Sequence, residues 1–182
     1  MIDLRKKSLP DAITVDGKDF LLKTDFREWL KFSELIKQKR PLSEYFFLFK
    51  DEVPRCDFFE LLCEFYLNEN STPQSDNNDD ERVLDYIEDG EYIVASFIQA
   101  YGIDLTSIEY MHWHLFKALV IGLPAETMMS KIIGFRSWEK TKKSMDDISR
   151  DLKRKWALPD KEKIERDKQT LEEINNYFFG AR

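Results

Sequence analysis

Histidine is the side chain best suited to acid–base catalysis and metal binding near neutral pH, and the chain has two, His112 and His114. Both lie in an apolar run for which the spacing predicts a helix. Residues two apart do not share a helix face, so the two imidazoles are not expected to hold one metal ion together. The pattern indicates an aromatic core segment whose imidazoles bond to the backbone, and we expect no metal site.

Cysteine is the next candidate for chemistry, and the chain has Cys56 and Cys63. On the helix that we predict for residues 55–67, a seven-residue spacing separates the two thiols by about 10 Å along the axis. This distance is too great for a disulfide within the helix. We expect both to be buried, small apolar residues in a reducing compartment.

Other motifs that carry chemistry are absent from the sequence. The acidic run 76–81 lacks the glycine and the alternating oxygen ligands of a calcium loop. The six glycines form no phosphate-binding loop, and the nucleophile motif GxSxG does not occur. We therefore expect a non-enzymatic protein that needs no cofactor.

Charge is distributed unevenly along the chain. The formal net charge is -7, so nonspecific DNA binding is not the default expectation. Residues 131–158 nevertheless contain nine Lys and Arg but only four acids. Residues 81–130 contain two Lys and Arg and eight acids. The basic segment 140–155 is either a solvated helix face or a contact for nucleic acid or an acidic protein surface. Within it, Ile148, Leu152 and Trp156 have helical spacing, which predicts that one side packs.

The first third of the chain predicts a β-hairpin followed by helices. Residues 12–22 alternate around Asp16-Gly17, a pair that accepts the positive φ angles of a tight turn. A helix is expected from Thr24-Asp25 to about Lys39, ended by Pro41. Residues 42–49 are ambiguous between helix and strand, with helix favoured because helices flank them. Helical spacing returns over 55–67, and residues 68–80, which contain no large apolar side chain, predict a mobile polar loop.

The most apolar stretch, residues 85–136, predicts three further helices. The first covers about 88–101 and ends at Gly102, a residue that accepts the left-handed conformation. The second covers about 108–121, capped by Thr106 or Ser107, and is apolar on most of its circumference, which is typical of a buried helix. The third covers about 125–133 and ends at Gly134. No apolar run reaches 18 residues, so no membrane-spanning helix is expected.

The last part of the chain predicts an amphipathic helix, or a pair of short helices, over 137–158, then a final helix over about 161–178. The sequence thus predicts a mainly α-helical fold. We expect one helical domain over residues 1–158 with a small N-terminal β-hairpin. The final helix, within residues 159–182, is expected either to dock on this domain or to extend from it.

Three ordered blocks of the central stretch carry a resemblance. They are Tyr92-Ile-Val-Ala-Ser-Phe-Ile-Gln-Ala-Tyr-Gly-Ile-Asp-Leu105, His112-Trp-His-Leu-Phe-Lys-Ala-Leu119 and Lys131-Ile-Ile-Gly-Phe-Arg136. Together with Ile2-Asp-Leu-Arg-Lys-Lys-Ser-Leu-Pro10 and Thr24-Asp-Phe-Arg-Glu-Trp-Leu-Lys-Phe32, they resemble the bacteriophage gp-fifteen family. Members of this family are encoded in tailed phages and prophages of Gram-positive bacteria, beside the tape-measure gene.

The resemblance implies a protein of phage tail morphogenesis, with no catalytic residues to assign. We expect an assembly chaperone that acts on tape-measure or tail-tube components in the host cytoplasm. A structural component of the tail, and a nucleic-acid-associated protein using the 140–155 face, remain as alternatives. Self-association is also open. The expected partner-binding residues form the apolar stripe of the final helix: Ile164, Leu171, Ile174, Tyr177, Phe178 and Phe179.

Overall fold

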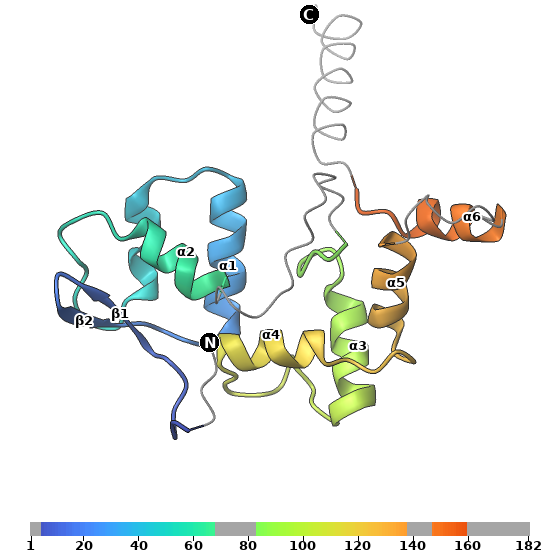
Figure 1. The fold of residues 1–182 in the computed structure, drawn as a ribbon, viewed down its shortest axis with the longest axis horizontal. Helices are drawn as coiled ribbons and strands as arrows, with labels where there is room; N and C mark the ends of the chain where they lie inside the picture. The colour runs from blue at the N-terminus through green and yellow to red at the C-terminus, as the bar shows by residue number, and fades with distance from the viewer. Residues whose placement is uncertain (1–4, 68–82, 138–146, 160–182) are drawn as a thin grey trace, which may run out of the picture.

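The computed structural model describes residues 5–67, 83–137 and 147–159, and the elements within them are mainly helical (Figure 1). The predicted fold class, mainly α with a small N-terminal hairpin, is confirmed. The elements in chain order are β1 (Ala12–Val15), β2 (Lys18–Leu21), α1 (Phe26–Lys37), the 3-10 helix η1 (Leu42–Leu48), α2 (Phe59–Leu67), α3 (Gly90–Tyr101), α4 (Trp113–Ile121), α5 (Met128–Arg136) and α6 (Asp147–Trp156).

The N-terminal hairpin has the predicted turn. Asp16 and Gly17 have φ angles of 50° and 77°, and Val15 pairs with Lys18 across the turn. These positive angles give a turn whose twist matches that of the two strands. The chain beyond β2 continues the pairing, because the backbone N–H of Lys23 donates to the Leu48 carbonyl at 2.7 Å. This contact attaches the hairpin to η1.

Helix α1 begins as predicted but ends early. The Asp25 carboxylate accepts the backbone N–H of Arg27 at 3.0 Å and so caps the first turn. The helix ends at Lys37 because Lys39 is left-handed, with φ of 52°, before Pro41 is reached. Residues 42–48 form the 3-10 helix, and α2 begins at Phe59, four residues later than expected.

The start of α4 differs from the predicted start at residue 108. Residues up to Met111 are not helical, and His112 is the N-cap. The reason is a tertiary pairing with the segment that leads into α1. Phe26 N–H donates to the Met111 carbonyl at 2.9 Å, and Trp113 N–H donates to the Thr24 carbonyl at 2.7 Å. Extended backbone pairing thus replaces the first turn of the predicted helix.

The glycines near α3 and α5 behave differently from each other. Gly102 ends α3 in the left-handed conformation, with φ of 67°, as predicted. Gly134 does not end α5, which runs from Met128 to Arg136 rather than over 125–133. Thr127 caps this helix by accepting the backbone N–H of Ser130, so the whole element starts and ends about three residues later.

Aromatic side chains of α4 join the two sides of the fold. In Figure 1, α1, α2 and the hairpin lie on one side of α4, and α3, α5 and α6 lie on the other. The Phe116 ring stacks on Phe26 of α1 at 4.7 Å and on Phe97 of α3 at 5.6 Å. The Trp113 ring stacks on Tyr66 of α2 at 5.0 Å. The buried apolar residues therefore form one cluster across both sides.

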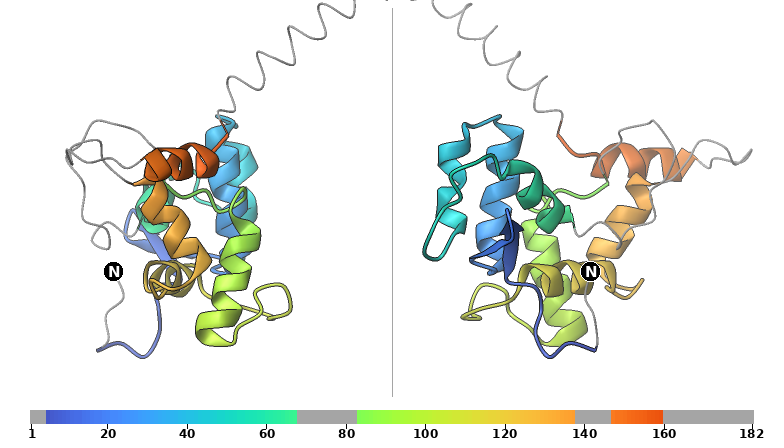
Figure 2. Two further views of the ribbon diagram at one scale, coloured as in Figure 1. Left: turned by 90° about the vertical axis from the view of Figure 1, so that its right-hand side faces the viewer. Right: turned by 60° about the vertical axis from the view of Figure 1, so that its left-hand side comes forward.

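On the side of α4 that contains α3, α5 and α6, helix α5 packs against both of the other helices. Figure 2 shows α3 and α5 side by side, with α6 across the end of α5. The backbone N–H of Met129 donates to the Ser96 hydroxyl at 3.2 Å, which joins α5 to the buried face of α3. Helix α6 therefore packs mainly against α5 rather than against the aromatic cluster around α4.

Candidate functional site

The two histidines lie at the start of α4, and both are buried. His112 Nδ1 accepts the backbone N–H of His114 at 3.0 Å, and His112 Nε2 lies 2.9 Å from the Pro10 carbonyl. His114 Nε2 lies 2.8 Å from the Phe65 carbonyl. The expectation of backbone partners is confirmed. The premise that both histidines lie within one helix, on different faces, is wrong, because His112 is the extended N-cap of α4 and the two ring centroids are 5.1 Å apart.

These contacts fix the protonation of both imidazoles. Since a carbonyl only accepts, each Nε2 carries the proton and each Nδ1 is an acceptor. Burial lowers the pKa of His112, and it lowers the pKa of His114 to about 4. Among the described residues, His114 Nδ1 has no hydrogen-bond partner. Both rings are therefore neutral at pH 7 and hold the start of α4 in place.

Side chains of α4 also cap the C-terminal end of α2. Trp113 Nε1 donates to the Tyr66 carbonyl at 3.0 Å, and Lys117 Nζ donates to the carbonyls of Tyr66 and Leu67, the latter at 3.0 Å. The last carbonyls of a helix lack donors within that helix, and a cation is favourable there. Burial lowers the pKa of Lys117 to about 8. This lysine serves in a structural cap.

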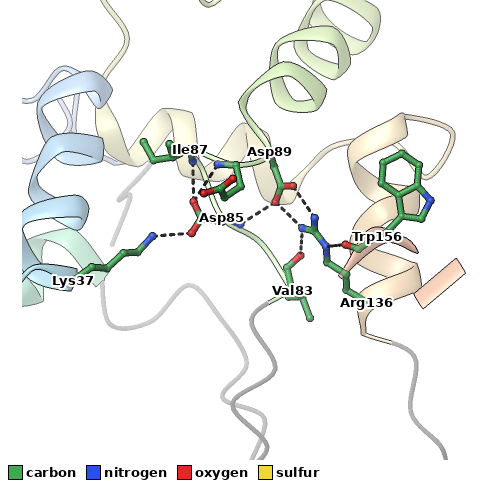
Figure 3. Close-up of polar contacts among 8 residues, drawn as sticks. Lys37, Val83, Asp85, Ile87, Asp89, Arg136 and Trp156 are labelled. Atoms are coloured by element: carbon green, nitrogen blue, oxygen red, sulfur yellow. Dashed lines mark hydrogen bonds and ion pairs between the residues drawn. The ribbon is translucent and has the colours of Figure 1, made fainter. Parts of the chain in front are cut away.

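A buried charge pair joins three helices on the other side of α4 (Figure 3). The two terminal nitrogens of Arg136 bind the two carboxylate oxygens of Asp89 at 2.6 and 2.8 Å. Arg136 Nε donates to the Trp156 carbonyl at 2.6 Å, and Nη1 donates to the Val83 carbonyl at 3.2 Å. One guanidinium thus links the cap of α3, the last turn of α5 and the last residue of α6.

Asp85 extends this network toward α1. Its carboxylate lies 2.8 Å from Lys37 Nζ and accepts the backbone N–H groups of Ile87 and Glu88. Burial alone would raise the pKa of Asp85, but Lys37 and the two amides outweigh it and hold the pKa at about 2. Asp85 N–H in turn donates to the Asp89 carboxylate at 2.9 Å. The network is a structural clamp between distant segments.

Sequence reasoning did not identify this network. Its available signal is the pair Asp85 and Asp89, two acids one helical turn apart within the most apolar stretch. Acids in such a stretch are buried only when they are paired. The sequence does not show that Lys37 and Arg136, which are 48 and 47 residues away from their acids, supply the positive charges.

Metal and thiol chemistry find little support in residues 5–67, 83–137 and 147–159. Within these ranges, no three His, Cys, Asp or Glu side chains are grouped so that they could hold an ion. Cys56 is exposed and precedes α2, whereas Cys63 is half-buried. The expectation that both are buried on one helix is therefore wrong for Cys56. An open hollow of about 710 Å³ beside the hairpin is lined by charged groups, including Lys18, Glu52 and Arg55.

The described helices expose several large apolar side chains. Helix α4 is buried on one face only, since Leu115 and Ile121 are exposed, which corrects the expectation of a helix buried all round. Ile98 of α3 and Ile148 of α6 are also exposed. None of the described helices is long and apolar enough to cross a membrane. Single exposed apolar side chains occur on most protein surfaces, so these positions alone identify no contact surface.

The residues predicted to bind a partner, Ile164, Leu171, Ile174, Tyr177, Phe178 and Phe179, lie outside the described residues. The predicted polar loop 68–80 and the final helix lie outside them too. Of the basic segment 140–155, residues 147–155 belong to α6. The prediction that one side of α6 packs is correct for Leu152 and Trp156, which are half-buried, and wrong for Ile148, which is 65% exposed.

Comparison with known proteins identifies the family. Residues 56–174 match the family model described as Bacteriophage Gp15 protein, so the match covers more than half of the chain. The range includes the α4 caps and the Asp89–Arg136 pair. No curated protein and no solved structure matches the chain. The resemblance seen in the ordered blocks is confirmed, and the chain belongs to the Bacteriophage Gp15 protein family of phage structural or assembly proteins.

Proposed function

We propose that this protein is a tail-assembly factor that binds tape-measure or tail-tube components in the host cytoplasm before they are built into the tail. The observation that carries the proposal is the family match over residues 56–174. Long helices with bare apolar stripes associate with one another, so a helical client needs cover until the tail forms around it. A small helical protein with exposed apolar side chains is suited to that role.

The proposed role requires no enzymatic chemistry. The side chains that most resemble catalytic groups have structural partners, because His112 caps α4, His114 bonds to α2, and Lys117 caps α2. This use of the polar groups supports a binding function over catalysis.

Deletion of the gene from its phage or prophage tests the proposal. We expect lysates with filled heads and no tails by electron microscopy, and rescue by the same gene supplied on a plasmid. Mass spectrometry of purified particles then separates a transient factor from a tail component. Absence from particles fits the assembly factor, whereas a stoichiometric amount would make it a structural part. Normal tails without the gene would refute both roles.

A further inference from the structure

The N-terminal hairpin belongs to a small sheet that is paired on one side only. The backbone N–H of Lys50 donates to the Leu21 carbonyl at 3.0 Å. The N–H of Lys23 donates to the Leu48 carbonyl at 2.7 Å, so residues 48–50 pair with the outer side of β2. The hairpin lies at the outside of the fold (Figure 1). Strand β1 is therefore the edge strand of this sheet.

The register of the hairpin shows which backbone groups of β1 point outward. Leu22 N–H donates to the Asp11 carbonyl at 2.8 Å, so these two residues form a hydrogen-bonded pair. Bonded and non-bonded pairs alternate along an antiparallel ladder, so the backbone groups of Ala12 and Thr14 point away from β2. Within the part of the chain that the structure describes, no hydrogen bond joins these groups to another residue. Strand β1 thus offers two donors and two acceptors to another strand.

The edge of β1 has few of the features that prevent strand pairing. Proteins protect sheet edges with proline, lysine, bulges or inward-pointing charges. Strand β1 has the uncharged sequence Ala-Ile-Thr-Val, its register with β2 is uninterrupted, and Thr14 is exposed. Ile13 and Val15 are buried and β1 packs against α2, so the strand is held in an extended conformation. Its length of four residues limits the site to one short strand.

Acidic residues at both ends of β1 determine which strand fits. Asp11 precedes the strand and Asp16 follows it, and both are exposed. Helix α2, which packs against β1, adds two exposed glutamates and contains no Lys or Arg. In the hairpin itself, Lys18 is paired with Glu52. The cations of residues 5–7 lie further away, because the segment that precedes β1 runs away from the hairpin (Figure 1).

A second copy of this chain is disfavoured as the occupant. Antiparallel pairing of two β1 strands about an axis through Ile13 would bring Asp11 of one copy beside Asp16 of the other, at both ends of the pair. Like charges on neighbouring strands are destabilising. A strand with lysine or arginine at both ends replaces this repulsion by attraction.

We propose that the free edge of β1 binds an extended segment of a partner protein as an additional antiparallel strand. The segment has about four uncharged residues between lysines or arginines, to match the length of β1 and the acids at its ends. Main-chain bonds to Ala12 and Thr14 supply affinity, and the flanking charges supply selectivity. The net charge of -7 also attracts a basic partner. The inference rests on the proposed function for the presence of a client, and it adds the conformation and charge of the client segment.

A synthetic peptide tests the inference with the full-length protein. The probe is fluorescent Lys-Lys-Val-Thr-Val-Thr-Val-Lys-Lys, and we expect saturable binding by fluorescence anisotropy. Opposed residues of an antiparallel pair share a face of the sheet, so valines join the buried side with Ile13 and Val15. The peptide threonines then lie opposite Ala12 and Thr14 and point their N–H groups toward β1. N-methylation of the threonines should weaken binding at least about tenfold, whereas N-methylation of the valines between them should leave it within about twofold.

Two variants of one residue locate the contact on the protein. Thr14→Pro removes an N–H group that points outward and takes no part in the β1–β2 ladder, so the hairpin should keep its pairing. This variant should weaken peptide binding at least about tenfold. Thr14→Ala loses the hydroxyl group that donates to Asp19 at 2.6 Å but keeps the backbone N–H, and should bind within about twofold.

A matched pair of double variants tests the charges. Asp11→Asn/Asp16→Asn should weaken binding roughly fivefold, and asparagine suits the tight turn at residue 16. Glu109→Gln/Glu126→Gln makes the same charge change at exposed positions outside the hairpin and α2, and should leave the affinity within about twofold. Unchanged thermal unfolding of each variant shows that the fold is intact.

Several outcomes would overturn the inference. They are no binding of the peptide, equal binding of its two N-methylated forms, undiminished binding by Thr14→Pro, or equal binding of a peptide with glutamate in place of lysine. Self-association of the protein that Thr14→Pro abolishes would assign the edge to a second copy. Should Thr14→Pro unfold the protein, the two N-methylated peptides decide with the unaltered chain.

The proposed function is judged separately from the β1 edge. If gene deletion abolishes tails but the two N-methylated peptides bind equally, tail assembly stands and the inference about β1 fails. If deletion leaves tails normal while the peptides and variants behave as expected, the edge binds a basic strand and the proposed function fails.

Discussion

His114 illustrates how this fold uses its ionisable side chains. A buried polar group costs free energy unless it is hydrogen-bonded, so each buried histidine, lysine and acid is expected to have a partner. His114 donates to the Phe65 carbonyl, and His112 and Lys117 also bond to backbone groups. These residues join segments that are far apart in the sequence. Their roles explain why side chains typical of catalysis occur in the core of a protein for which we propose no catalysis.

The first prediction concerns stability against pH. The pKa of His114 is about 4 in the folded protein, below its ordinary value of 6.5, so the unfolded chain binds the proton first as pH falls. The contribution of neutral, buried His114 to the free energy of unfolding is therefore fully present above pH 6.5, and it is lost as the pH falls from about 6.5 to about 4. One such group gives a loss of up to roughly 1.4 kcal/mol per pH unit. Urea unfolding at a series of pH values measures this loss.

The variant His114→Gln separates this effect from other titrations. Glutamine keeps an N–H donor for the Phe65 carbonyl and does not titrate, so its stability should fall less steeply between pH 6.5 and 4. Asp85, whose pKa is held at about 2, loses its contribution only below its ordinary pKa of 3.8 and so lies outside this window. Equal slopes in the two proteins would show that His114 is not buried as the structure places it.

The second prediction concerns the buried pair Asp89 and Arg136. Asp89→Asn or Arg136→Met leaves one group of the pair buried without its partner, which costs about 3–5 kcal/mol. The double variant should lose less than the sum of the two single losses, because no uncompensated charge remains. Urea unfolding followed by tryptophan fluorescence gives the three values. The exposed ion pair between Arg154 and Asp151 provides the control, because Arg154→Met should change the free energy of unfolding by less than about 1 kcal/mol.

At the scale of elements, the sequence predicts what local chemistry decides. The Asp16-Gly17 turn and the end of α3 at Gly102 follow from backbone conformations that few residues accept. The start of α4 could not be predicted in this way. Thr106 and Ser107 are good caps, but pairing of Met111 and Trp113 with the Thr24–Phe26 backbone imposes an extended segment up to His112. The Asp25 carboxylate also accepts the Met111 N–H at 3.1 Å, across 86 residues of sequence, so a distant segment decides where this helix begins.

The candidate sites show the same division between local and long-range information. The burial of Trp113 and Phe116 follows from the apolar spacing within one helix. The Lys37–Asp85 and Asp89–Arg136 pairs depend on which segments meet in space, and no local pattern contains that information. The spacing of Ile148, Leu152 and Trp156 likewise predicts an apolar stripe on one face of a helix. How many of these residues become buried depends on how α6 packs against α5, which the spacing does not show.

The third prediction tests α4 as the element that joins the two sides of the fold. Trp113 and Phe116 are 0% and 1% exposed, so replacing either by alanine should cost roughly 3–5 kcal/mol in the free energy of unfolding. Leu115→Ala, on the exposed face of the same helix, should cost less than about 1 kcal/mol. Thermal and urea unfolding provide the values. Small losses at both core positions would mean that this face of α4 is a groove.

At the scale of the whole molecule, the family match extends beyond the described fold. It continues to residue 174 and so includes most of the segment 160–182. In that segment Ile164, Leu171, Ile174 and Phe178 fall at offsets of 0, 7, 10 and 14, a stripe typical of a helix that lies against another helix. A narrow stripe among so many charges buries little area by itself. The segment is therefore expected to contact either its own domain or another molecule.

The last prediction distinguishes these two arrangements by deleting residues 160–182. Docking on the same domain predicts a lower melting temperature, because the apolar area that the stripe covers becomes exposed to water. An arm that binds a second copy or a client predicts an unchanged melting temperature, with loss of self-association or of client co-purification. The variant Leu171→Ser/Ile174→Ser removes the centre of the stripe while keeping the chain length, and should reproduce whichever effect the deletion has. Unchanged stability, oligomeric state and partners in both proteins would contradict both arrangements, and would leave the exposed side chains of α3, α4 and α6 as the surfaces to test for client binding.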